Sequence, residues 1–194
     1  IQEQDLVIHL HPLKLTGQGS KARAEYEYMT RWIKQRENKV IVFSNKRQEC
    51  WKKYGLNCDG VTYFNSDNYK DIGVQAILGE NKLINPITLS TIYMGCGVEV
   101  KHEKEVDVVF FLNEGFDDST IIQSIGRPRC SGGVEKVNVH FFYTTDCAFK
   151  GRYKPEDVDF LKNAFDNLVV YENHVILTNV LAAYMTGIWD SSFN

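Results

Sequence analysis

The sequence contains little of what cross-links a chain or carries it through a membrane. Its 194 residues include 5 cysteines, which are odd in number, widely spread and without a CxxC pair. This pattern argues against a disulfide framework or a structural zinc site, and it fits reduced thiols. No stretch approaches the ~18 apolar residues of a membrane span. We therefore expect a cytoplasmic protein with no membrane partner and no metal ligands of its own.

A strong charge of either sign is also missing. The net charge is −3 and the pI about 6.0, which disfavours a dedicated basic nucleic-acid binder but leaves room for a local basic patch. The first residues, Ile1–His11, lack the regions of a signal peptide, and the chain has no initiator methionine. We expect it to be part of a longer protein.

Alternating strand and helix patterns fill most of the chain. We expect strands at 5–11, 39–45, 61–64, 87–93, 106–112 and 136–143, and helices at 20–35, 46–54, 69–78, 118–125, 155–169 and 175–189. Such alternation predicts a three-layer α/β fold with a mostly parallel sheet. Strands give way to helices after about Lys150, so we expect a domain over 1–150 and a helical extension packed on it over 151–194.

Ligands of parallel sheets gather outside the carboxyl ends of the strands. We therefore look for chemistry in the loops after Phe43, Thr91 and Leu112 and in the segment at Gly126. The segment Leu15–Arg23, LTGQGSKAR, faintly resembles a phosphate loop, but its spacing does not fit GxxxxGK[ST]. A plain turn with Ser20 as a helix cap explains it better.

Three later segments carry polar residues that suit phosphates and a nucleotide. VIVFSN (Val40–Asn45) is a buried strand that ends in small polar groups, and LSTIYMGCGVEV (Leu89–Val100) delivers Ser90 and Thr91 to a glycine-containing loop. STIIQSIGRPRCSGG (Ser119–Gly133) places two arginines, which bind phosphate well, on a turn stiffened by proline. Taken singly, the first two segments are better explained as an ordinary strand end and an ordinary loop. The two arginines of the third favour a functional role over a plain surface turn.

Together, and in this order, the segments resemble the second RecA-like motor domain of superfamily-two helicases of the DEAD/DEAH type. VIVFSN is similar to motif IV, and Thr91, Gly97 and Glu99 match the T-x5-G-x-D pattern of motif V. QSIGRPRC is similar to motif VI, QxxGRxxR, and the preceding VDVVFFLN matches the strand between motifs V and VI. The resemblance covers about Lys39–Tyr143 and implies a RecA-like fold.

The resemblance also implies roles for individual residues. Arg127 would be an arginine finger on the γ-phosphate of ATP, with Arg129 as a second phosphate contact. The rest of the nucleotide site would be Gln123, Gly126, Gly97 and Glu99, the last meeting the ribose. Nucleic-acid phosphates would be held by Ser44, Asn45, Ser90 and Thr91. A basic helix face with Lys46 and Arg47 would follow the nucleic-acid backbone or simply face solvent.

This sequence departs from the family pattern in two places. Glu99 stands where the family usually has Asp, and the second arginine of motif VI would fall at Cys130, one position after Arg129. Some relatives, such as herpesvirus origin-binding helicases, are similar in writing the motif as GRxR.

The chain also lacks a Walker A motif and a DExH or DEAD box. The resemblance therefore implies half of an ATP site, completed by an N-terminal motor domain of the same protein, which would hold Mg2+. DNA or RNA would be the track. A non-catalytic nucleic-acid- or protein-binding module and a nucleotide-using enzyme on a flavodoxin-like sheet remain alternatives. The histidines His9, His11, His140 and His174 have no metal spacing and are interpreted as structural.

Overall fold

The computed structural model describes residues 4–13, 21–91, 94, 98–114, 116, 118–128 and 132–144. Its strands are β1 (Asp5–Leu13), β2 (Lys39–Phe43), β3 (Val61–Phe64), β4 (Ile87–Ser90), β5 (Glu105–Phe111) and β6 (Lys136–Thr144). Its helices are α1 (Lys21–Lys34), α2 (Gln48–Lys53), α3 (Ile72–Glu80) and α4 (Asp118–Ile125), with short 3-10 turns η1 (Ser66–Asn68) and η3 (Leu112–Glu114). The expected extension over 151–194 and the Ser20 cap lie outside the described residues.

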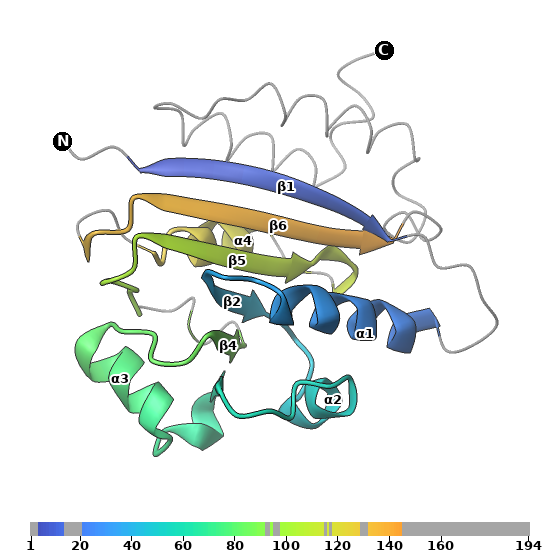
Figure 1. The fold of residues 1–194 in the computed structure, drawn as a ribbon, viewed down its shortest axis with the longest axis horizontal. Coiled ribbons are helices and arrows are strands. Elements are labelled where there is room, and N and C mark those ends of the chain that lie inside the picture. Colours follow the sequence, from blue (N-terminus) through green and yellow to red (C-terminus); the bar gives the residue numbers. More distant parts are fainter. Residues whose placement is uncertain are drawn as a thin grey trace, which may run out of the picture.

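The six strands form one sheet in the order β1-β6-β5-β2-β4-β3. Every neighbouring pair is parallel, so the sheet is fully rather than mostly parallel. Parallel neighbours need crossover connections, and the helices between the strands supply them. The predicted fold class, a three-layer α/β architecture, is confirmed (Figure 1).

Two apolar clusters lie on opposite faces of this sheet. Strand β2 shows why, because Val40 and Val42 belong to one cluster while Ile41 and Phe43 belong to the other. Such a strand, buried on both faces, reads as a continuous apolar run. Helices α1 and α2 cover the Val40 face through Tyr26, Met29, Ile33 and Trp51. Helices α3 and α4 cover the Ile41 face through Val74, Ile77, Ile121 and Ile125, and Figure 1 shows α1 in front of the strands and α4 behind them.

Several element boundaries differ from the sequence-based expectation, and capping explains the clearest case. Helix α3 begins at Ile72 rather than at 69 because the Asp71 carboxylate accepts hydrogen bonds from the amides of Gly73 and Val74, at 2.8 and 3.2 Å. It ends at Glu80, and the capping residue Asn81 adopts the left-handed conformation with φ 57°. Helix α2 begins at Gln48, so Lys46 and Arg47 lie in the preceding loop rather than on a helix face.

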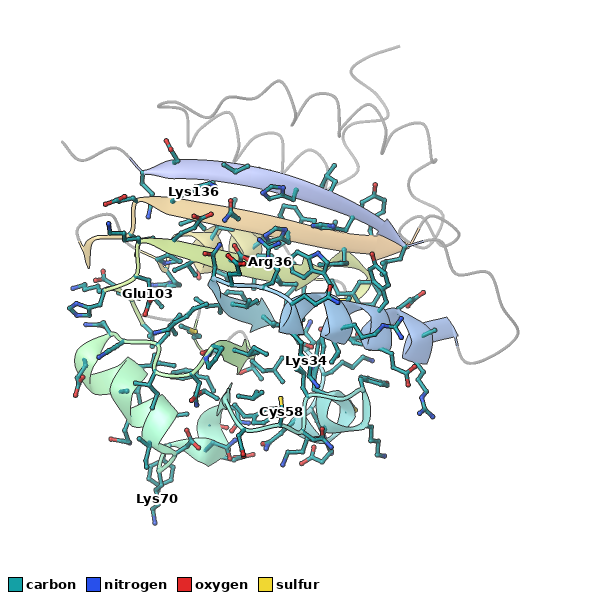
Figure 2. All side chains as sticks on the ribbon, in the orientation of Figure 1. Lys34, Arg36, Cys58, Lys70, Glu103 and Lys136 are labelled. Carbon is teal, nitrogen blue, oxygen red and sulfur yellow. The ribbon has the colours of Figure 1, made fainter. Side chains whose placement is uncertain are left out.

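A polar network lies on the α1 face of the sheet. Asp107 of β5 is fully buried and accepts hydrogen bonds from Arg36 at 2.6 Å, Asn38 at 3.1 Å and Asn138 at 2.9 Å. Burial raises the pKa of Asp107, but His140 and these three donors together hold it well below its usual range. In Figure 2, Arg36 projects over the middle of the sheet. The network fixes α1 and the loop after it against β5 and β6.

None of the described helices is both long and apolar enough to cross a membrane.

Candidate functional site

A polar cleft of about 540 Å³ opens at the carboxyl ends of β2, β3 and β4. Five of the six residues predicted to bind nucleic acid line it, although they come from two separate segments of the chain. These are Ser44, Lys46, Arg47, Ser90 and Thr91. The sheet produces this convergence, because β2 and β4 are parallel neighbours with Phe43 opposite Ser90 in the register. Asn45, the sixth predicted residue, is exposed in the same loop.

The side chains around the cleft differ in what they can offer a ligand. Lys46 and Arg47 are exposed and supply positive charge. Ser44 and Ser90 are buried, and their hydroxyls donate within the protein, Ser44 to Glu114 at 2.8 Å and Ser90 to the Thr91 carbonyl at 2.7 Å. The two cations are therefore the groups of this set that a phosphate can reach without breaking an internal bond.

The far wall of the cleft was not anticipated from the sequence. It is formed by the turn after β3, where the Asn65 side chain accepts from the amides of Asp67 and Asn68 at 2.9 and 3.0 Å. Asn68 in turn donates to Gln48 at 3.0 Å and so connects this turn with the start of α2. The clustering of Asn, Ser and Asp directly after a strand was the signal that marks such a turn.

Glu114 is a second residue that sequence reasoning missed. It follows β5 in η3, and its carboxylate accepts from Tyr26 at 2.7 Å and from the Ser44 hydroxyl at 2.8 and 3.0 Å. It also accepts from the main-chain amide of Asn45. Burial raises the pKa of Glu114, while these hydrogen bonds oppose the rise. The sequence feature that could have pointed to Glu114 was an acidic residue close after β5, the most apolar strand.

The residues assigned to the nucleotide gather elsewhere. The amide of Val100 donates to the carbonyl of Arg127 at 2.9 Å, and Val100 forms a parallel bridge with Pro128. This pairing brings Glu99 and Arg127 next to each other although 27 intervening residues separate them. Gly126 and Gln123 belong to the same helix end, and Gln123 is exposed while Arg127 and Glu99 are half-buried.

The Gly126 segment does not lie at the carboxyl ends of the strands, so that part of the sequence-based expectation is wrong. Helix α4 starts after the carboxyl end of β5 and runs back along the sheet for about 12 Å, at 1.5 Å per residue. Its end therefore comes near the start of the strands, where Gln4, just before β1, donates to the Pro128 carbonyl at 3.2 Å. Figure 2 shows Glu103 and Lys136 at this same edge, where β5 and β6 begin.

The groups at this second site carry both signs of charge. Glu99 pairs with Lys101 at 3.2 Å. The guanidinium of Arg127 suits a polyphosphate, and a carboxylate such as that of Glu99 suits hydroxyl donors. Gly97, Arg129 and Cys130 lie outside the described residues, so their predicted roles stay predictions. Within the part of the chain that is described, no group of three or more His, Cys, Asp or Glu could hold a metal ion.

Comparison with known proteins gives matches only among solved structures. No family model and no curated protein matches the sequence. The chain is similar to the DUF1998 helicase MrfA bound to DNA, at 15% identity over 92% of this chain and 26% of that one, with a TM-score of 0.45. It is also similar to the C-terminal domain of the DEAD-box protein Dbp5, at 12% identity over 86% and 99% of the two chains, with a TM-score of 0.46.

A third match is the C-terminal part of the Fun30 ATPase domain, at 13% identity over 83% of this chain and 53% of that one, with a TM-score of 0.48. The three matched structures are thus a helicase, the C-terminal domain of a DEAD-box protein and the C-terminal part of an ATPase domain. The chain spans about a quarter of the MrfA structure. A likeness at this level concerns the fold, so activity and partners must be inferred from the residues of this chain.

Proposed function

We propose that this chain is the second motor domain of an ATP-dependent helicase or translocase that moves on DNA or RNA. The observation that supports it best is the separation of the motif residues into two sites. Those assigned to nucleic acid surround the cleft at the carboxyl ends of the strands. Of those assigned to ATP, the described ones, Glu99, Gln123, Gly126 and Arg127, lie at the other end of the strands, where the amide of Val100 donates to the carbonyl of Arg127.

The cleft offers what a nucleic-acid backbone requires. Contacts to phosphate come mainly from Lys and Arg, with hydroxyls, amides and main-chain N–H groups fixing the register. Lys46 and Arg47 supply the charge, and Ser44, Ser90 and Thr91 line the same cleft. Contacts to phosphate carry no direct sequence information, so we expect binding that depends strongly on salt and weakly on sequence.

The second site fits half of an ATP site. Arg127 would contact the γ-phosphate, Gln123 would lie beside it, and Glu99 would accept from the ribose once it exchanges its contact with Lys101. An arginine aimed at a transferring phosphoryl group stabilises the charge that develops there. The Walker A lysine and the Mg2+ ligands would come from an N-terminal motor domain of the same protein, so this domain alone would not hydrolyse ATP.

Two sites at opposite ends of the strands of one rigid sheet also suit a motor. ATP bound between two lobes would draw Arg127 toward the first lobe, and hydrolysis would release it. The cleft would move with the same sheet, so its grip on the strand would shift with each cycle. Binding and release of phosphates by two such surfaces in turn would step the protein along the strand.

The test is ATP hydrolysis by the protein that joins this domain to its first motor domain, with and without DNA and RNA. Arg127→Ala should lower the rate by on the order of 10³ without unfolding the domain. Arg31→Ala, at an exposed arginine of α1, is the matched control and should leave the rate unchanged. Full hydrolysis in Arg127→Ala would contradict the finger and favour a non-catalytic binding module.

A further inference from the structure

One carboxylate ties the cation-bearing loop of the cleft to two other elements. Glu114 of η3 accepts from Tyr26 of α1 at 2.7 Å and from the hydroxyl of Ser44 at 2.8 Å. It also accepts from the amide of Asn45, the residue directly before Lys46 and Arg47. Helix α1, the end of β2 and the segment after β5 therefore meet at this single side chain.

The Ser44 hydroxyl donates its single proton to Glu114, because its other hydrogen-bonding positions are occupied. Its oxygen accepts from the indole N–H of Trp51 at 2.9 Å and from the amide of Lys46 at 3.0 Å. With both acceptor positions used, its one proton goes to Glu114. The amides of Asn45 and Lys46 are thus held, the first directly by Glu114 and the second through Ser44.

We propose that Glu114 is a positioning residue for the phosphate-binding loop Ser44–Arg47, fixing Lys46 and Arg47 toward a single-stranded nucleic-acid backbone. This inference rests on the proposed role of the cleft in binding nucleic acid. Every hydrogen-bond partner of the Glu114 carboxylate is a donor, so Glu114 accepts all of these bonds and does not act as a proton donor. No contact with the nucleic acid is assigned to Glu114 itself.

The direction of the change in nucleic-acid affinity distinguishes a positioning role of Glu114 from a purely electrostatic effect of its charge. A carboxylate beneath an anion-binding cleft repels phosphate, so its removal should by itself strengthen binding slightly. A positioning role predicts the reverse, because the freed loop must be ordered again whenever the ligand binds. Glu114→Gln is the informative change, since its amide N–H₂ would face the Asn45 N–H or the Ser44 hydroxyl.

The first experiment needs no ligand. In ¹⁵N-labelled wild-type chain, the Asn45 and Lys46 amides should exchange slowly with solvent. In Glu114→Gln their exchange should accelerate about tenfold or more, as expected for loss of a charge-assisted hydrogen bond, while the β5 and β6 amides keep their wild-type rates. Tyr26→Phe is the matched control, because it removes only the α1 bond and should leave both loop amides protected.

The second experiment measures the affinity of the chain for a fluorescent single-stranded oligonucleotide at low salt. Glu114→Gln should weaken binding about fivefold to tenfold, the equivalent of about 1–1.4 kcal/mol. In a Lys46→Ala/Arg47→Ala background the same change should have little further effect, because the cations through which it acts are gone. A global loss of structure would weaken binding in both backgrounds.

The outcomes distinguish this inference from the function on which it rests. Unchanged amide exchange, or tighter binding by Glu114→Gln, would overturn the positioning role. Equal losses of oligonucleotide affinity from Glu114→Gln in the wild-type and the Lys46→Ala/Arg47→Ala backgrounds would overturn the positioning role as well. Accelerated exchange in a chain whose wild type does not bind the oligonucleotide would uphold the effect on the loop, but it would contradict the assignment of the cleft to nucleic acid.

Discussion

His9 of β1 lies directly opposite His140 of β6, and their rings stack with centroids 4.5 Å apart. His11, two residues along, is within hydrogen-bond distance of the same ring, with its Nε2 3.0 Å from Nδ1 of His140. Three histidines that are scattered in the sequence thus form one cluster beside Asp107, whose Oδ1 is 3.7 Å from Nε2 of His140. Parallel pairing of the first and last described strands brings them together.

This cluster predicts a loss of stability in mild acid. Burial lowers the pKa of His11 from 6.5 to about 4, with further repulsion from His140, His9 and Arg36. Burial also lowers the pKa of His140, although the neighbouring Asp107 opposes this shift. The unfolded chain therefore takes up protons that the folded chain refuses, and stability falls as the pH drops from about 6.5 toward 4. After allowance for the partial exposure of His11, we expect a loss of about 1–3 kcal/mol.

Urea unfolding at pH 7.5, 6 and 5 measures this loss. His11→Asn should flatten the dependence over that range, since it removes one titrating group and its repulsion of His140. Asp107 titrates below this window because its pKa is lowered, so it does not obscure the result. An identical pH profile for wild type and variant would show that the histidines do not control acid stability.

Removal of the Asp107 carboxylate should be more costly than removal of a surface carboxylate. Asp107→Ala removes the acceptor of Arg36 and Asn38 and one of the two hydrogen bonds of Asn138, which also donates to Glu105. We expect a loss of about 2–4 kcal/mol in the free energy of unfolding. Glu27→Ala breaks an exposed pair with Arg23 and should have no measurable effect. Chemical denaturation of both variants makes the comparison, and similar losses would contradict the structural role of the network.

Two glycines of α3 provide a matched test of helix packing. A Cβ at Gly73 would lie 2.1 Å from the Thr62 hydroxyl of β3, whereas one at Gly79 would meet nothing within 4 Å. Gly73→Ala should destabilise the protein by about 1–3 kcal/mol through overpacking. Gly79→Ala should stabilise it by about 0.5–1 kcal/mol because alanine favours the helix. Thermal unfolding of the pair would refute this packing if the two shifts had the same sign.

The sequence predicted the sheet well because its strands are strongly apolar runs. The β-branched run at Val40–Val42 and the stretch Val106–Phe111, which is apolar apart from Asp107, are typical of strands in a sheet covered on both faces. It also indicated that the segments after β2 and β4 lie on the same side of the sheet, because the carboxyl ends of parallel strands meet there, but it did not indicate that the turn after β3 completes the cleft. It could not place Glu114 or the Gly126 segment, since their positions depend on side-chain contacts and on the direction of α4.

The cations of the cleft should determine how binding depends on salt. Each phosphate contact contributes about 0.7 to the slope of log affinity against log salt for a single strand. Lys46→Ala/Arg47→Ala should therefore reduce the slope by about 1.4. Lys34→Ala, at an exposed lysine of α1, should leave it unchanged. Titrations of one oligonucleotide at four salt concentrations are sufficient, and an unchanged slope in the double variant would remove these cations from the interface.

Two variants of the protein that contains both motor domains, each studied by two measurements, show directly whether the nucleic-acid site and the ATP site are separate. Arg127→Ala should abolish ATP hydrolysis while the affinity for a single strand, measured without nucleotide, stays near wild type. Lys46→Ala/Arg47→Ala should weaken that affinity and retain the basal hydrolysis that needs no nucleic acid. Two separate sites at opposite ends of the strands predict that each variant loses one property and keeps the other. Equal loss of both properties in both variants, with the fold intact, would contradict the account.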